Sequence, residues 1–166
     1  MCEKIITAVF DNEKTAYRAI SELQNNYVTR FYYIYAAVML KKYDGVLIPV
    51  CGFDANNGYV DTSQVSGIVG IITAVLSEDP AIYKNTVLLK DIAQAVTGEK
   101  AAVLFNSIEY DNDTFDYIFQ KYSVYPKRTD RSVIQDEILS IINISTKDFS
   151  VCKIDLRESG KKGNTI

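Results

Sequence analysis

The chain has 166 residues, of which 48% are hydrophobic and 23% are charged. A chain of this length can bury about two-thirds of its unfolded surface in one core, so we expect a single domain over residues 1–144 and a partly disordered C-terminal extension over residues 145–166. The net charge of −3 lacks the excess of basic residues that binding to a nucleic-acid backbone requires, which argues against a nucleic-acid partner.

The types of residue that are absent narrow the chemistry further. The chain contains no histidine, which removes the commonest general base and the commonest metal ligand. Cys2, Cys51 and Cys152 lie far apart in the sequence, which argues against a disulfide framework or a zinc site. The first residues do not resemble a secretory signal. We therefore expect a cytoplasmic protein with no cofactor, no metal and no catalytic residues, and the composition favours a protein without enzymatic activity.

The chain opens with a pattern typical of a strand followed by a helix. Residues 4–10 form a nearly continuous apolar run, as in a strand that is covered on both faces. Asp11 or Asn12 is a suitable cap for the helix that follows. That helix is predicted to end at Asn25-Asn26, and its apolar stripe consists of Ala16, Ile20, Leu23 and Tyr27.

A β-rich region follows from residue 30 to residue 50. Asp44-Gly45 is a strong hairpin signal between two apolar runs. Pro49 cannot donate to a strand ladder, so the second strand is predicted to lie at a sheet edge or to end there. Residues 54–63 are rich in turn formers, with a loop tip at Asn56-Asn57. The tyrosines of the first strand fit two interpretations, namely packing or interface use, and a ligand pocket.

The central segment, residues 65–76, is apolar but shorter than the roughly twenty residues that cross a bilayer. It is predicted to be a buried or interfacial helix. Small residues recur four positions apart, which allows another backbone to approach closely: Ser63 and Gly67, then Ser66, Gly70 and Ala74. Gly67, Gly70 and Ala74 are therefore a candidate interface, and a core helix that contains glycine is the alternative. Peripheral contact of this segment with a membrane is a weaker option.

The next helix is predicted to begin at Asp79-Pro80, because proline suits the first helical position. Ile82, Leu88, Leu89, Ile92 and Val96 form its apolar stripe, and Gly98 is a suitable stop. Residues 63–97 thus form a helical insertion.

Residues 101–125 repeat the opening pattern of strand and helix. Asp111 and Asp113 precede the second helix as Asp11 and Glu13 accompany the first, and Tyr117 takes the place of Tyr17. A short strand is predicted at residues 124–128 and a last helix at residues 132–142. Phe149 and Val151 alternate as in a further strand, before a frayed tail.

Three further motifs do not indicate a binding or catalytic site. Asp111, Asp113 and Asp116 resemble a calcium loop, but Asp116 occupies the position that requires glycine and Tyr122 the position that requires glutamate. Acidic residues that complement a helix dipole explain them. Gly67 and Gly70 lack the remainder of a phosphate-binding loop. The basic residues Lys127, Arg128 and Arg131 are interpreted as solvated surface.

The order of these segments resembles the bacterial domain-of-unknown-function 1269 family. The segments that carry the resemblance are ITAVFDNEKTAYRAISEL, a β-hairpin, SGIVGIITAVL, LLKDIAQAVTGEK and AAVLFNSIEYD. The resemblance covers residues 4–142 and implies a ferredoxin-like α+β core with no catalytic residues. Two strand-helix-strand units would give one antiparallel sheet with two helices on one face. The central helices or a second subunit would cover the other face.

Two functions follow from these observations. The first is a self-associating, non-enzymatic module with a regulatory or stress-related role, in which a homodimer forms through the central helices and the aromatic sheet. The second is a small-molecule sensor or a divergent enzyme with a pocket between the sheet and the central helices, lined by Tyr33, Tyr35 and Cys51.

Overall fold

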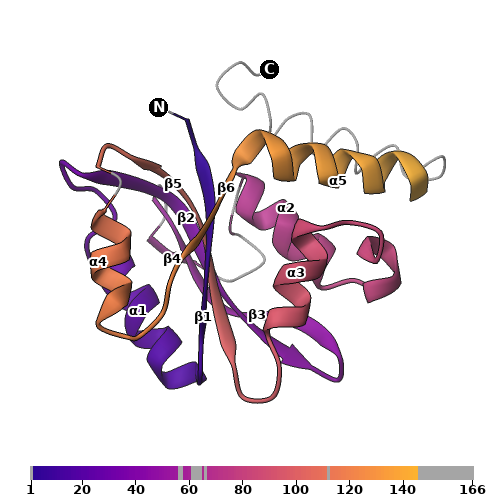
Figure 1. The fold of residues 1–166 in the computed structure, drawn as a ribbon, viewed down its shortest axis with the longest axis horizontal. Coiled ribbons are helices and arrows are strands. Elements are labelled where there is room, and N and C mark those ends of the chain that lie inside the picture. Colours follow the sequence, from indigo (N-terminus) through magenta and orange to yellow (C-terminus); the bar gives the residue numbers. More distant parts are fainter. Residues whose placement is uncertain (1, 56–57, 61–64, 66, 112, 146–166) are drawn as a thin grey trace.

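The structure is a computed structural model that describes residues 2–55, 58–60, 65, 67–111 and 113–145. It is an α+β fold in three layers, with one antiparallel sheet between two groups of helices (Figure 1). Its elements are β1 (Lys4–Phe10), α1 (Glu13–Asn25), β2 (Tyr32–Tyr43), β3 (Val46–Asp54), β4 (Gly58–Val60), α2 (Gly67–Leu76), η2 (Pro80–Tyr83), α3 (Leu88–Ala95), β5 (Ala101–Glu109), α4 (Thr114–Gln120), β6 (Lys127–Asp130) and α5 (Arg131–Ser145).

The sheet has six strands in the order β4-β3-β2-β5-β1-β6. Every neighbouring pair is antiparallel. The sequence predicted a sheet of four strands, and the structure extends it with β3 and β4 beyond β2. The strand β5 lies between β1 and β2, and it is buried over most of its length because helices cover both faces of the sheet.

The two strand-helix pairs predicted at residues 4–26 and 101–125 are both present, and α1 and α4 lie on the same face of the sheet (Figure 1). The cap of α1 is Asn12, whose side chain accepts a hydrogen bond from the Thr15 backbone at 2.8 Å. Rings from β1, β5 and α4 meet beneath these helices, and Phe105 lies 5.1 Å from Phe115 between ring centres in an edge-to-face arrangement. This geometry is a favourable one for aromatic pairs.

The other face of the sheet is covered from within the chain by α2, α3 and α5. The central helices therefore supply the cover that the sequence analysis had left open between them and a second subunit. The single helix predicted from Pro80 to Val96 is wrong, since the chain forms the short helix η2 and then α3. Asp79 caps η2 as expected, with its side chain accepting from the Ala81 backbone at 3.0 Å.

The hairpin at Asp44-Gly45 is confirmed, with positive φ at both residues. Pro49 does not end its strand, because β3 continues to Asp54 and pairs with β4, a strand that the turn-rich sequence had concealed. Within the described residues, β4 pairs with β3 only from Gly52 onward. No described residue pairs with the outer side of the strand at Pro49, and proline is tolerated at such a position because it has no backbone N–H to donate.

The last strand lies later than predicted, at Lys127–Asp130 instead of residues 124–128, and α5 follows it directly. The prediction of a final helix is confirmed, with Ile134 and Ile138 buried. Several predictions lie outside the described residues: the loop tip at Asn56-Asn57, the small residues Ser63 and Ser66, the strand at Phe149 and Val151, and the surroundings of Cys152.

Candidate functional site

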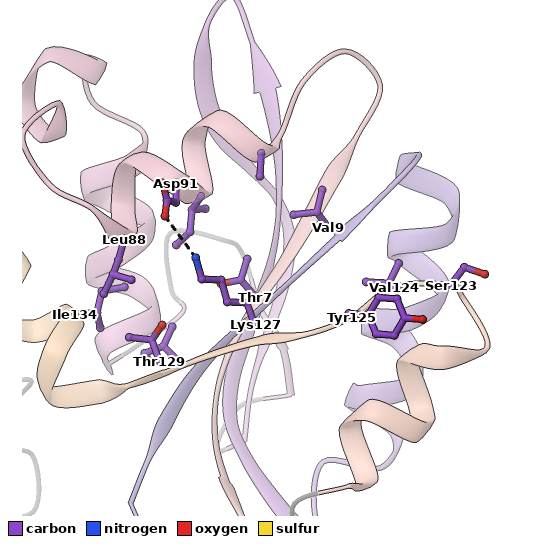
Figure 2. A pocket seen from close by; sticks show the side chains of 13 residues that line it. Thr7, Val9, Leu88, Asp91, Ser123, Val124, Tyr125, Lys127, Thr129 and Ile134 are labelled. Carbon is purple, nitrogen blue, oxygen red and sulfur yellow. Dashed lines mark hydrogen bonds and ion pairs between the residues drawn. The ribbon is translucent and has the colours of Figure 1, made fainter.

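A cavity of about 320 Å³ lies between α3 and the edge of the sheet formed by β1 and β6 (Figure 2). It lies on the face that the central helices cover, and Ile134 of α5 closes part of it. Its lining consists of Ile5, Thr7, Val9, Leu88, Asp91, Ile92, Ala95, Ser123, Val124, Tyr125, Lys127, Thr129 and Ile134. The volume is at the small end of the range of about 300–1,000 Å³ that is typical of ligand pockets.

The strand register places the floor of the cavity. Side chains of a strand alternate between its faces, so Ile6, Ala8 and Phe10 pack under α1 and α4, while Ile5, Thr7 and Val9 point towards α3. Antiparallel pairing then sets Thr129 opposite Ile5 and Lys127 opposite Thr7. The floor thus combines aliphatic side chains with two threonine hydroxyls and one lysine.

The wall formed by α3 is held in place by a side chain from α5. The Glu137 carboxylate accepts hydrogen bonds from the backbone of Leu89 at 2.8 Å, of Leu88 at 3.1 Å and of Val87 at 3.3 Å. These are the unpaired N–H groups of the first turn of α3, which has no side-chain cap of its own. A carboxylate at this end of a helix is favoured by hydrogen bonding and by the helix dipole. Glu137 therefore fixes the wall that carries Asp91.

Two charged side chains face each other across the cavity. Lys127 Nζ lies 3.4 Å from Asp91 Oδ2, and both side chains are more than half exposed, at 62% and 51%. Figure 2 shows Lys127 reaching from β6 towards Asp91, with Leu88, Thr129 and Ile134 to one side of this pair and Val9 and Tyr125 to the other. Apart from this pair, the lining is aliphatic or hydroxylic. The arrangement can hold a small molecule that has both apolar and charged parts.

The pocket residues predicted from the sequence do not meet at this cavity. Tyr33 and Tyr35 contact each other on β2, with ring centres 4.8 Å apart. Burial raises the pKa of the Tyr35 phenol, and the nearby carboxylate of Glu3 adds to this effect. Cys51 instead packs against the cluster beneath α1 and α4, opposite Met39. None of these three residues lines the cavity, and their use as a ligand pocket stays a prediction.

Cys51 lacks the surroundings of a reactive thiol. It is half-buried, and burial raises the pKa of its thiol, with a smaller contribution from the carboxylate of Glu13. A raised pKa reduces the thiolate fraction near neutral pH, whereas a nucleophilic cysteine needs a lowered one. The geometry at Cys51 therefore indicates packing.

The candidate interface on α2 has an explanation within the chain. Gly67 has a φ of +72°, a backbone conformation that residues with a side chain rarely adopt. A Cβ atom at Gly70 would lie 2.2 Å from the backbone oxygen of Val65, so the close approach for which glycine is needed comes from the preceding loop. Ala74 is exposed on the same helix. The use of Gly67, Gly70 and Ala74 as an interface stays a prediction.

The basic residues near β6, interpreted as solvated surface, are paired with carboxylates. Arg128 donates to both oxygens of Glu109 at 2.7 and 2.8 Å and to Asp116 at 3.0 Å. Arg131 forms an ion pair with Glu3. These contacts tie β6 to α4 and to β5, and tie the first residue of α5 to the beginning of the chain, so the residues hold the edge of the sheet together.

The described residues hold no group of three or more histidine, cysteine, aspartate or glutamate side chains that could bind a metal ion. Within the same part of the chain, no helix combines the length and the apolar character needed to cross a bilayer. Comparison with known proteins gave no match to a protein-family model, to a curated protein or to a solved structure.

Sequence reasoning missed the cavity because its lining comes from four elements, β1, α3, β6 and α5, and from the connection between α4 and β6. Its aliphatic residues look like ordinary core residues, and Asp91 and Lys127 look like solvated surface charges. The one available signal was the interruption of the apolar run in β1, where Thr7 stands among apolar residues.

Proposed function

We propose that the protein is a non-enzymatic binding module that holds a small molecule in the cavity between α3 and the edge formed by β1 and β6. The observation that carries this proposal is a cavity of about 320 Å³ whose lining is mostly apolar and includes the ion pair of Lys127 and Asp91. Small-molecule sites commonly combine apolar walls with a few polar groups that orient the ligand.

The chemistry of the lining favours binding over catalysis. The charged side chains in the lining are Lys127 and Asp91, and each neutralises the other. A general acid or base needs a pKa near the working pH and a position next to the reacting atom. We therefore propose this cavity as the site of the small-molecule sensor that the sequence analysis gave as an alternative, and we do not propose the divergent enzyme that was named with it.

The test is a thermal-shift screen of a fragment library against the protein and two variants. A ligand that binds only the folded state raises the unfolding temperature with its concentration. Ala95 is exposed and lines the cavity, so Ala95→Trp would fill it without disturbing the core. Gln94→Trp, one residue earlier and outside the lining, is the matched control.

The proposal expects fragments that stabilise the natural protein and the Gln94→Trp variant but not Ala95→Trp. An absence of stabilising fragments, or equal shifts for both variants, would contradict it.

A second candidate is self-association through the outer face of α1 and α4. Tyr17 of α1 and Tyr117 of α4 are 51% and 79% exposed on this face. Beside them, Glu22 and Lys121 border a groove of about 360 Å³. Tyrosine is enriched at protein interfaces. Light scattering after size exclusion at micromolar concentration should show that the natural protein is a dimer. The double variant with Tyr17→Ser and Tyr117→Ser should be a monomer. A natural protein that is strictly monomeric would exclude this candidate.

The finer fold assignment is also a proposal. The strands β6-β1-β5-β2, together with α1 and α4, correspond to a ferredoxin-like core to which β3, β4 and the central helices are added. What supports it is that β5 lies between β1 and β2, and that β1 lies between β5 and β6. The resemblance to the domain-of-unknown-function 1269 family and the cytoplasmic location stay predictions.

A further inference from the structure

The charges of the cavity favour one class of ligand. A ligand with a single charge would pair with either Lys127 or Asp91 and leave the other without its partner. A ligand with no charge would leave both paired with each other. A zwitterion satisfies both, because its carboxylate can accept from Lys127 while its ammonium group donates to Asp91.

The existing ion pair is suited to such an exchange. Its 3.4 Å separation is long for a charge-assisted hydrogen bond, and exposed pairs of this kind contribute little to stability. Opening the pair therefore costs little, and the two new contacts to a ligand can be shorter. The two charges lie on different elements, α3 and β6.

The surroundings of the pair define the rest of the ligand. Leu88, Ile92, Ile5 and Ile134 give an aliphatic wall next to the charges, and Figure 2 shows Leu88 and Ile134 on one side of the pair. The hydroxyls of Thr7 and Thr129 on the floor can donate to a carboxylate. The cavity of about 320 Å³ has room for an apolar part the size of one side chain.

From these features, and on the basis of the proposed binding function, we infer that the cavity binds a small apolar α-amino acid as its zwitterion. The carboxylate lies on Lys127 Nζ, the ammonium group lies on the Asp91 carboxylate, and the side chain packs against the aliphatic wall. An α-amino acid separates its two charged groups by a single carbon atom, which matches two opposite charges that already lie close together.

The test is isothermal titration calorimetry of the full chain with leucine and two analogues. One analogue, 4-methylpentanoate, lacks the amino group, and the other, 3-methylbutylamine, lacks the carboxylate. A comparison of isoleucine, valine, methionine and phenylalanine tests which size of side chain packs against the aliphatic wall. Contacts between charges that are this exposed are expected to contribute about two- to fivefold each in affinity, so leucine should bind about two- to fivefold more tightly than either analogue.

Two variants assign the contacts. Lys127→Met should lower the affinity for leucine and 4-methylpentanoate but not for 3-methylbutylamine. Asp91→Asn should lower the affinity for leucine and 3-methylbutylamine but not for 4-methylpentanoate. Thermal unfolding of both variants checks that they fold, which we expect because both side chains are more than half exposed.

This inference would be overturned if leucine and one analogue bound with equal affinity. It would also be overturned if fragments bound in the cavity but none of the five amino acids did. In both cases the proposed function would still hold. The proposed function fails separately, if no fragment is lost in the Ala95→Trp variant.

Discussion

Replacing Glu137 tests how the wall of the cavity is held. Its carboxylate accepts three backbone hydrogen bonds at the start of α3, the closest from Leu89 at 2.8 Å. Glu137→Ala removes every one of these acceptors. Glu137→Gln keeps one amide oxygen in place but removes the negative charge. The two variants therefore separate the hydrogen-bonding contribution from the contribution of charge.

The expected loss follows from the number and kind of these contacts. Removing a helix cap costs about 0.5–2 kcal/mol, and a negative charge at the positive end of a helix contributes about 0.3–1 kcal/mol. Because Glu137 is only partly buried, water can replace some of the lost acceptors. We expect Glu137→Ala to lower the free energy of unfolding by about 2 kcal/mol and Glu137→Gln to lower it by about 1 kcal/mol.

Equilibrium unfolding in urea, followed by far-ultraviolet circular dichroism, measures this difference. Asp136→Ala is the matched control, because Asp136 is the neighbouring, exposed acidic residue of the same helix. Hydrogen exchange should show that Glu137→Ala speeds exchange of the first amides of α3 more than those of β5. If Glu137→Ala and Asp136→Ala changed the free energy of unfolding by the same amount, the capping role would be refuted.

Three further variants test other contacts of the fold. Arg128→Met strands a carboxylate whose side chain is 6% exposed and should cost about 3 kcal/mol in urea unfolding, against about 1 kcal/mol or less for the exposed Lys121→Met; equal losses would contradict this. Burial, with a hydrogen bond to Glu22, raises the pKa of Tyr122 from 10.0 to about 12, so its stabilisation is full below pH 10 and is lost as the pH rises to about 12. We expect the stability difference from Tyr122→Phe to fall across that range by about 1 kcal/mol after discounting for partial exposure, and a constant difference would count against it. Gly70→Ala places a methyl group 2.2 Å from a backbone oxygen and should cost about 2 kcal/mol in thermal unfolding; unchanged stability with a changed oligomeric state would instead favour the interface hypothesis.

Local signals predicted most of the fold. Asn12 caps α1, Asp44-Gly45 turns the hairpin and the apolar run of β5 forms a strand buried on both faces, because each of these depends on residues close in the sequence. The errors arose where distant contacts decide. The strand β4 was not predicted because its residues have a turn-rich composition and become a strand only by pairing with β3. The segment after Pro80 divides in two because α3 begins where Glu137 of α5 supplies its cap.

The candidate site was predicted less well than the fold. Its general place, between the sheet and a central helix, was expected, but Tyr33, Tyr35 and Cys51 do not line it. The tyrosines of β2 were candidates for a ligand pocket, but Tyr33 and Tyr35 pack against each other. Asp91 and Lys127 lie 36 positions apart, and only the register of β6 on β1 and the position of α3 bring them together. No pattern of residues close in the sequence predicts that Asp91 and Lys127 form an ion pair.

The claim that the cavity is a binding site is tested most directly by amide chemical shifts during a titration of the isotope-labelled protein with leucine. The account predicts saturable shifts concentrated in β1, in α3 and in β6. The account would be contradicted if the shifts were confined to α1 and α4. It would also be contradicted if neither millimolar leucine nor any cavity fragment caused saturable shifts.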